Sequence, residues 1–286
     1  MTDAEGPTTE RSLPEYDKQL SGFHGAFWRE LQAIVKELPL RSEMRVLDLA
    51  SGDGFYTRLI AEQLGLGGSI VGVDTSLAYL SEASAATARK RGHTRVDFVA
   101  GSFDRLPFAD NTFDLVWCAQ SLYSLPDPVV AIGHMARVLR PGGLVAIFEN
   151  DTLHKVFLPW PVRLELPLRA AELRSFLEGG NSSKYYVGRR LPAILAAAGV
   201  EPLRMATYAF DRQAPLGEVE EGLLQSYLEE VLERVAPHLD GPLLEELRHL
   251  VDPESPQHLL RQPHLTMTWL SVLAFGRKRP VDHGGK

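Results

Sequence analysis

The sequence R-V-L-D-L-A-S-G-D-G-F-Y-T, residues 45–57, decides the fold. Its apolar residues as far as Leu49 predict a short buried strand, and the run Ser-Gly-Asp-Gly at 51–54 supplies turn residues that end it. Residues 59–64 then place apolar side chains at helical spacing. A glycine loop between a strand and a helix directs backbone N–H groups out of the carboxyl end of the strand, where a ligand can bind.

The glycine loop lacks the features of two common phosphate-binding loops. A dinucleotide fingerprint requires a third glycine, but Thr57 occupies that position, and the G-K-[ST] signature of a phosphate-binding loop is absent. An acid, Asp48, precedes the loop. A carboxylate at this place disfavours a pyrophosphate and favours a cationic group such as an amine or a sulfonium.

The run V-L-D-L-A-S-G-D-G resembles the first motif of the class I S-adenosylmethionine-dependent methyltransferases. The resemblance implies that the cofactor contacts Asp48, Ala50, Gly52 and Gly54. Ala50 stands where this family usually has its first glycine. Because alanine adds a single methyl group, we expect tighter packing at this position without loss of binding.

A second buried strand, residues 69–74, ends in Asp74. It lies about 20 residues beyond the glycine loop, where a carboxylate can accept hydrogen bonds from both hydroxyls of a ribose. The alternative is that Asp74 caps the helix predicted from Ser76, although Thr75 or Ser76 can serve as that cap. The ribose role, with Thr75 beside it, suits both S-adenosylmethionine and NAD.

Residues 95–99 predict a third strand, and the following run, 101–117, resembles the second and third methyltransferase motifs. The resemblance implies that Ser102, where the family most often has aspartate, accepts a hydrogen bond from the adenine amino group. It also implies that Phe103 lies beside the adenine. The alternative for Phe103 is packing in the core.

The fourth strand, residues 115–120, ends at Gln120, which is expected beside the glycine loop because ligands bind where the strand order reverses. Tyr123 follows, where many members of the family carry histidine. It is a candidate catalytic residue, although a tyrosine is a poor base at neutral pH unless its pKa falls. A helix over 129–139, a turn at 140–143 and a fifth strand at 144–149 complete the pattern.

The region after the fifth strand is individual to this chain, and the resemblance implies that it forms a lid over the methyl acceptor. His154 is a candidate general base, with a surface histidine as the alternative reading. Aromatic and basic residues in and around this region are candidates for binding the methyl acceptor, with packing or anchoring of the lid as the alternative: Tyr16, Trp160, Tyr186 and Arg189. A helix is expected from Arg169 to Glu178.

These elements predict an α/β fold with a doubly wound, seven-stranded, mainly parallel sheet whose last strand is antiparallel. An amphipathic helix with a solvated acidic face is expected within 217–254, where it can cover the pocket or form a dimer contact. We divide the chain into an N-terminal tail and cap helix (1–44), an S-adenosylmethionine-binding core (45–150), a lid insertion (151–187) and the rest of the core (188–286), which contains the acidic helical insertion at 217–254.

The composition bounds the function. The 286 residues carry a formal net charge of −7, which favours small-molecule substrates over nucleic acid. Cys118 is the only cysteine, so the sequence contains neither an internal disulfide nor a cysteine metal cluster, and we expect no bound metal. A secretion signal and a transmembrane helix are not apparent, and we therefore expect a cytoplasmic protein without a membrane partner, possible as a homodimer.

The predicted function is transfer of a methyl group from S-adenosylmethionine to an O, N or C nucleophile of a small, apolar or aromatic metabolite. The sulfonium is already activated, so the protein mainly aligns the reactants and excludes water. Two alternatives remain open: an NAD-dependent oxidoreductase on a related fold, and a non-catalytic scaffold protein that keeps the cofactor pocket.

Overall fold

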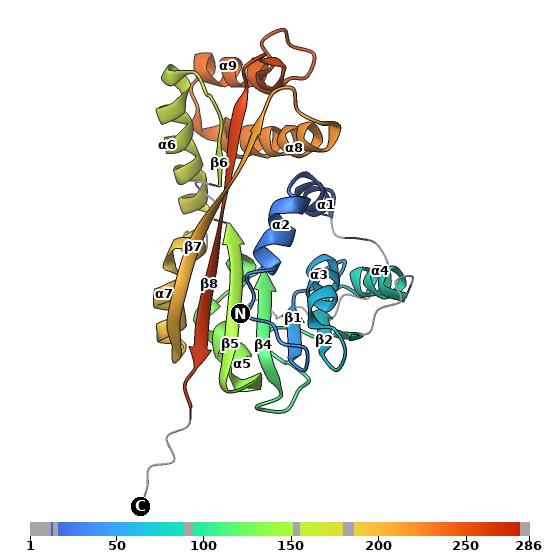
Figure 1. Cartoon of the computed structure of the whole chain (residues 1–286). Coiled ribbons are helices and arrows are strands. Elements are labelled where there is room, and N and C mark those ends of the chain that lie inside the picture. The colour runs from blue at the N-terminus through green and yellow to red at the C-terminus, as the bar shows by residue number, and fades with distance from the viewer. Residues whose placement is uncertain (1–12, 14–16, 89–93, 151–154, 180–185, 281–286) are drawn as a thin grey trace, which may run out of the picture.

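A twisted sheet with helices on both faces forms the body of the protein (Figure 1). The computed structural model describes residue 13 and residues 17–88, 94–150, 155–179 and 186–280. The sheet runs in the order β3-β2-β1-β4-β5-β8-β6, with β7 also paired to β8. The strands are β1 (Arg45–Leu49), β2 (Ser69–Asp74), β3 (Arg95–Ala100), β4 (Phe113–Ala119), β5 (Leu139–Asn150), β6 (Val156–Phe157), β7 (Val200–Gln213) and β8 (Thr266–Lys278).

This topology confirms the predicted fold class. Strands β1 to β5 pair in parallel, and β8 pairs antiparallel to β5, β6 and β7. The sheet has eight strands rather than seven, because the two-residue strand β6 pairs with β8 through Val156 and Trp269. The strand order reverses between β1 and β4, so the crevice at their carboxyl ends is the expected ligand site.

Alternating side chains divide the core into two layers. Trp117 on β4 and Phe148 on β5 belong to one hydrophobic cluster, whereas their neighbours Cys118 and Ile147 belong to the other. Successive residues of a strand point to opposite faces, so the two clusters lie on opposite faces of the sheet. The helices are α1 (Asp17–Ala26), α2 (Trp28–Val35), α3 (Phe55–Leu64), α4 (Leu77–Ala88), α5 (Pro128–Val138), α6 (Val162–Glu178), α7 (Val187–Ala197), α8 (Glu218–Val235) and α9 (Gly241–Val251).

The cap helix predicted within residues 1–44 is divided into α1 and α2 by Phe27, whose backbone leaves the helical region at φ −118° and ψ 21°. Phe27 is fully buried, and its ring packs against those of Phe23 and Phe210. The break therefore lets α1 change direction while its aromatic side chains stay in the core.

Helices α6, α8 and α9 gather beyond the carboxyl ends of β4 and β5, and the long strands β7 and β8 reach from the sheet into this helical lobe (Figure 1). Helix α6 begins at Val162, seven residues before the predicted start at Arg169, and it contains Pro167. A proline inside a helix removes a hydrogen bond. Burial of Leu164 and Leu168 on either side of Pro167 offsets this cost.

Two further observations limit the kinds of site available. Among the described residues, no helix combines the length and the apolar character needed to span a lipid bilayer. In the same part of the chain, no group of three or more His, Cys, Asp or Glu side chains is placed to hold a metal ion.

Candidate active site

The glycine loop after β1 is tightly turned. Ala50, Gly52 and Gly54 have φ values of 59°, 52° and 74°, all in the left-handed region. The amide of Ser51 donates to the carbonyl of Val73 at 3.0 Å, which ties the loop to β2. The loop therefore needs an unusual backbone conformation at three positions, and two of them are glycines.

The methyl group of Ala50 matters mainly because it disfavours the backbone conformation of this residue. We predicted that alanine would change packing, but the left-handed φ disfavours any residue with a Cβ. Ala50→Gly is therefore expected to stabilise the fold by about 0.5–1 kcal/mol. The matched control, Ala85→Gly on an exposed face of α4, should instead destabilise it by about 1 kcal/mol. Urea unfolding measures both, and a lower midpoint for Ala50→Gly would contradict the argument.

Asp74 lies at the end of β2, directly beside the loop. Its Oδ2 accepts from the amide of Gly52 at 2.9 Å, and its Oδ1 accepts from the amide of Ser76 at 2.8 Å. The helix cap is Ser76, whose hydroxyl accepts from the amide of Tyr79, so Asp74 is not needed for that role. The amide of Thr75 also faces this carboxylate, which still has lone-pair capacity left for a ligand. Thr75, predicted to accompany it, is half-buried between the two.

Asp48 is buried inside β1 rather than placed at an open loop entrance, and the hydroxyl of Thr57 donates to its Oδ2. Burial raises the pKa of Asp48 to about 7, against the opposing effect of the Thr57 hydrogen bond. The carboxyl is therefore only partly ionised at neutral pH. Its main observed contact is the link between β1 and α3, and its predicted attraction for a cation is weaker than full ionisation would give.

Gln120 follows β4 with φ 52°, and its amide donates to the carbonyl of Phe148 at 2.7 Å. Its Oε1 is buried and has no hydrogen-bond partner among the described residues. The same is true of the hydroxyl of Ser51 in the glycine loop. Buried polar atoms are normally paired, so these two are expected to face a ligand that donates hydrogen bonds.

The predicted adenine-contacting residues lie after β3. The carbonyl of Ser102 accepts from the amide of Arg105 at 3.2 Å, and the Ser102 side chain is half-buried. Phe103 packs against the hydrophobic cluster that contains Val73 and Leu106. Its backbone therefore lies near the end of β2, while its ring contributes to the core.

Glu149 is a fully buried acid at the carboxyl end of β5. Its Oε1 accepts from the amides of Ser121 and Leu122 at 2.9 and 2.5 Å, which fixes the turn after β4. Burial raises its pKa to about 8, although these amides oppose the shift. The carboxyl is thus largely protonated at neutral pH, and its Oε2 has no partner in the described part of the chain.

Helix α1 lies across the glycine loop and the start of α3. A Cβ built on Gly52 would be 3.7 Å from Cδ2 of Leu20, and the ring of His24 stacks on that of Phe55 with centroids 4.0 Å apart. Leu20 and His24 are four residues apart and therefore share a face of the helix. Sequence reasoning missed His24. The signal available was this spacing, which sets His24 apart from the aromatic face formed by Phe23 and Phe27.

The comparisons with known proteins agree with this geometry. Residues 47–147 match the sequence model of a family described as "Methyltransferase domain". The chain is 35% identical over 124 residues to a demethylmenaquinone methyltransferase of Staphylococcus aureus, covering 43% of this chain and 49% of that protein. The chain thus spans about half the length of this curated relative.

Residues 47–147 form a methyltransferase domain.

Solved structures resemble the fold over a larger part of the chain. The YcgJ protein of Bacillus subtilis is 18% identical with a TM-score of 0.56, covering 88% of this chain and 99% of that one. A SAM-dependent methyltransferase of Aquifex aeolicus is 20% identical with a TM-score of 0.50, covering 66% and 91%. At these identities the likeness shows the fold alone, and it confirms the predicted Rossmann-like architecture around the methyltransferase domain.

The other residues predicted to bind the methyl acceptor or to act in catalysis lie outside residues 47–147, with the exception of Tyr123. Tyr16 and His154 lie outside the described residues. Trp160 is buried in the hydrophobic cluster that lines the helical lobe. Tyr186 and Arg189 lie at the start of α7, where the guanidinium sits 4.8 Å from the tyrosine ring.

Tyr123 lies in the short 3₁₀ helix η1 (Leu122–Ser124), directly after the turn held by Glu149, and its side chain is partly exposed. Its predicted place after the fourth strand is therefore correct, and its catalytic role stays a prediction.

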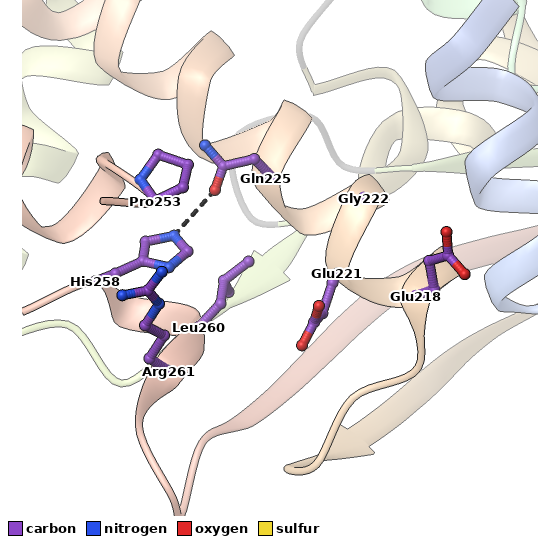
Figure 2. Close-up of a pocket in the computed structure, with 8 residues that line it drawn as sticks. All are labelled: Glu218, Glu221, Gly222, Gln225, Pro253, His258, Leu260 and Arg261. Atoms are coloured by element: carbon purple, nitrogen blue, oxygen red, sulfur yellow. Dashed lines mark hydrogen bonds between the residues drawn. The ribbon is translucent and has the colours of Figure 1, made fainter. Parts of the chain in front are cut away.

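A hollow of about 340 Å³ lies on the helical lobe, between α8 and the short 3₁₀ helix η4 (Leu259–Arg261) (Figure 2). His258 and Gln225 form a hydrogen bond of 3.0 Å on one side, and Glu218 and Glu221 extend from α8. The lining belongs to the lobe and contains no residue of the strand ends. Because it mixes two acids with Arg261 and a histidine, it favours neither an anion nor a cation, and we place the active site at the glycine loop.

Proposed function

We propose that this protein binds S-adenosylmethionine at the glycine loop and transfers its methyl group to a small aromatic or apolar compound. The observation that carries the proposal is the position of Asp74, whose two carboxylate oxygens hold the amides of Gly52 and Ser76 and keep lone pairs for ribose hydroxyls. It is supported by the match of residues 47–147 to the methyltransferase domain.

The hydrogen-bonding character of the site suits this cofactor. The ribose hydroxyls, the amine and the adenine amino group of S-adenosylmethionine are all donors. The residues offered to them are acceptors: the carboxylate of Asp74, the unpaired Oε1 of Gln120, and the hydroxyls of Ser51 and Ser102. The left-handed backbone at Ala50 and Gly52 shapes the loop for such a ligand, whereas Gly54 packs against Ala83 and Phe98.

When bound, S-adenosylmethionine supplies an electrophilic methyl group on a sulfonium. The protein's own contribution is then to orient the reactants and to exclude water. Helix α1 is placed to exclude water, because Leu20 lies over Gly52 and His24 lies over Phe55. Glu149 helps to orient the reactants, because it fixes the turn after β4 by accepting hydrogen bonds from two amides.

The methyl acceptor is proposed to be a phenol or hydroquinone with an apolar body. The Phe23 ring lies 5.1 Å from that of Trp269, and Trp269 lies 6.3 Å from Tyr227, so aromatic side chains fill the space between α1 and the helical lobe. These three rings are buried in the hydrophobic core, against which an aromatic ligand would pack well. The curated relative is named for demethylmenaquinone, which is a quinone by its name, and the reduced form of a quinone is a hydroquinone. Catalytic roles for Tyr123 and His154, and methyl-acceptor binding by Tyr16, Trp160, Tyr186 and Arg189, remain predictions.

Two other functions are less well supported. An NAD-dependent oxidoreductase requires donors for a pyrophosphate, whereas the amides of Ser51, Gly52 and Gly54 are already paired within the protein. Thr57 in the third glycine position is engaged with Asp48. A non-catalytic scaffold differs only in lacking turnover. The net charge of −7 supports a small molecule over nucleic acid as the partner. A cytoplasmic location without a membrane partner, and a possible homodimer, remain proposals from the sequence.

The test is calorimetric titration of the full chain with S-adenosylmethionine, S-adenosylhomocysteine and NAD, followed by mass spectrometry of reactions with 1,4-naphthohydroquinone. We expect micromolar binding of the first two ligands and a product heavier by one methylene. Tight binding of NAD alone would favour the oxidoreductase. Binding of S-adenosylmethionine without product from a panel of phenols and hydroquinones would favour the scaffold.

A further inference from the structure

We propose that His24 on α1 is a catalytic residue, the general base that removes a proton from the hydroxyl of the methyl acceptor. The inference rests on the proposed function and adds to it the group that activates the nucleophile. No residue of the predicted set has this position, because His24 comes from the N-terminal helix that covers the loop.

The position of His24 is fixed by two elements of the methyltransferase core. Leu20, one turn earlier on the same face of α1, lies against Gly52 of the glycine loop. The His24 ring is nearly parallel to that of Phe55, with an interplanar angle of 10°, and it meets the ring of Tyr56 edge-on at 5.3 Å. Phe55 is the first residue of α3. His24 therefore sits beside the glycine loop and the first turn of α3.

The ring nitrogens of His24 have no observed structural use. Both Nδ1 and Nε2 are buried, and neither has a hydrogen-bond partner among the described residues. The hydroxyl of Tyr56 beside them is also buried and unpaired. Unpaired buried polar atoms are costly, and a phenylalanine at position 24 would keep the stacking on Phe55 without that cost. We conclude that these atoms are held for a ligand with a polar group.

The environment keeps the imidazole in the form that accepts a proton. Burial lowers the pKa of His24 to about 3, and the nearby Arg58 guanidinium adds to the effect. Arg58 is itself paired with Asp53 of the loop. The neutral ring is therefore the species present at pH 7, and one nitrogen can accept a hydrogen bond from a phenolic hydroxyl. A pKa this low makes the ring a weak base before the methyl acceptor binds, so full proton transfer depends on the phenolate formed beside it, whose negative charge raises the pKa of the histidine.

The proposed step balances without any further reactant. The O–H bond of the methyl acceptor breaks and its proton binds one His24 nitrogen. The electron pair left on the oxygen of the methyl acceptor forms the new bond to the methyl carbon. Where a ring carbon conjugated with the oxygen attacks instead, that carbon then loses its proton and the oxygen regains one as the ring becomes aromatic again. The carbon–sulfur bond breaks with its pair retained by sulfur, which becomes a neutral thioether, and the proton on His24 passes to water when α1 moves away.

The first test compares His24→Gln and His24→Phe with wild type, using 1,4-naphthohydroquinone as the methyl acceptor. General-base removal is expected to lower kcat roughly 10²–10⁴-fold in both variants. The Kd for S-adenosylhomocysteine should stay within about threefold of wild type, because Asp74 and the glycine loop are intact. The control His249→Gln, on an exposed face of α9, should match wild type in both. A kcat within about threefold of wild type for His24→Gln would overturn the proposal.

Thermal unfolding gives a readout independent of turnover. Because His24→Phe removes two unpaired nitrogens, it is expected to raise Tm by roughly 2–6 °C while activity falls. A histidine with only a structural role would instead give a lower Tm. A lowered Tm in both variants would therefore contradict the catalytic assignment, whatever happens to the rate.

A spectroscopic test covers the case in which wild type binds S-adenosylhomocysteine but does not methylate the hydroquinone. The Cε1–H signal of His24 is identified by its loss in His24→Gln and followed as 1-naphthol is added to the complex with S-adenosylhomocysteine. We expect the signal to shift. An unchanged signal at millimolar 1-naphthol would overturn the proposal, whereas failure of wild type to bind S-adenosylhomocysteine would remove the proposed function itself.

Discussion

Replacing Asp74 with asparagine is expected to weaken the binding of S-adenosylhomocysteine at least about 100-fold, because hydrogen bonds to a charged group contribute about 1.5–3 kcal/mol each. The carboxylate of Asp74 accepts from two backbone amides, one on each oxygen. An asparagine must turn its NH₂ group toward one of them, where two donors face each other. The substitution therefore removes the ribose contacts and also disturbs the glycine loop.

Calorimetry with S-adenosylhomocysteine measures this effect directly. Asp97→Asn, an isosteric change on the partly exposed strand β3, is the matched control and should leave the Kd unchanged. Thermal unfolding of both variants separates lost binding from a lost fold. A Kd for Asp74→Asn within about threefold of wild type would show that Asp74 does not hold the cofactor.

Replacing Glu149 with glutamine is expected to make the protein more stable at alkaline pH. Glu149 has its pKa raised by burial from 4.5 to about 8, so the folded state keeps a proton that the unfolded state releases. Its stabilising contribution is complete below about pH 4.5 and is lost as the pH rises through about 8. Glutamine stays neutral throughout, and its Oε1 can still accept from Ser121 and Leu122.

The expected gain for Glu149→Gln is about 5 kcal/mol at pH 9 and below about 1 kcal/mol near pH 5, as an order of magnitude. Urea unfolding of the protein without ligand at the two pH values measures it. Glu201→Gln, on an exposed part of β7, should show no such pH dependence relative to wild type. If the difference between Glu149→Gln and wild type is the same at both pH values, Glu149 does not titrate as proposed.

The sequence was sufficient for the methyltransferase core because its signals are local. Each strand is a short apolar run, and the residues that end β1, β2 and β4 follow directly along the chain. The parallel topology brings those ends together, so Gly52, Asp74 and Gln120 could be predicted as neighbours without coordinates. The match of residues 47–147 confirms the predicted family for this segment, while the ligand contacts of these three residues remain predictions.

The elements that surround the methyltransferase core were harder to predict, because their positions depend on contacts between segments that are distant in the sequence. The stacking of His24 on Phe55 joins residues 31 positions apart, and periodicity alone does not say which face of α1 meets the glycine loop. The early start of α6 had a similar cause, because burial of Leu164 outweighs the local effect of Pro167. The role of Glu149 has no local signal either, because its observed partners are two amides that follow β4, almost 30 residues earlier in the chain.

The two glycines of α1 lie where this helix meets α8. A Cβ on Gly25 would be 3.0 Å from Cγ1 of Val219, and one on Gly22 would be 3.7 Å from Leu223. On its other side α1 contacts the glycine loop and α3, and the contacts described above on that side are made by Leu20 and His24. When ligands bind or leave, we expect the contact between α1 and the glycine loop to open, while the contact between α1 and α8 stays closed. Helix α1 would then move together with the helical lobe. The cofactor would then enter and the product would leave through the same opening, and the rate of this opening would limit kcat.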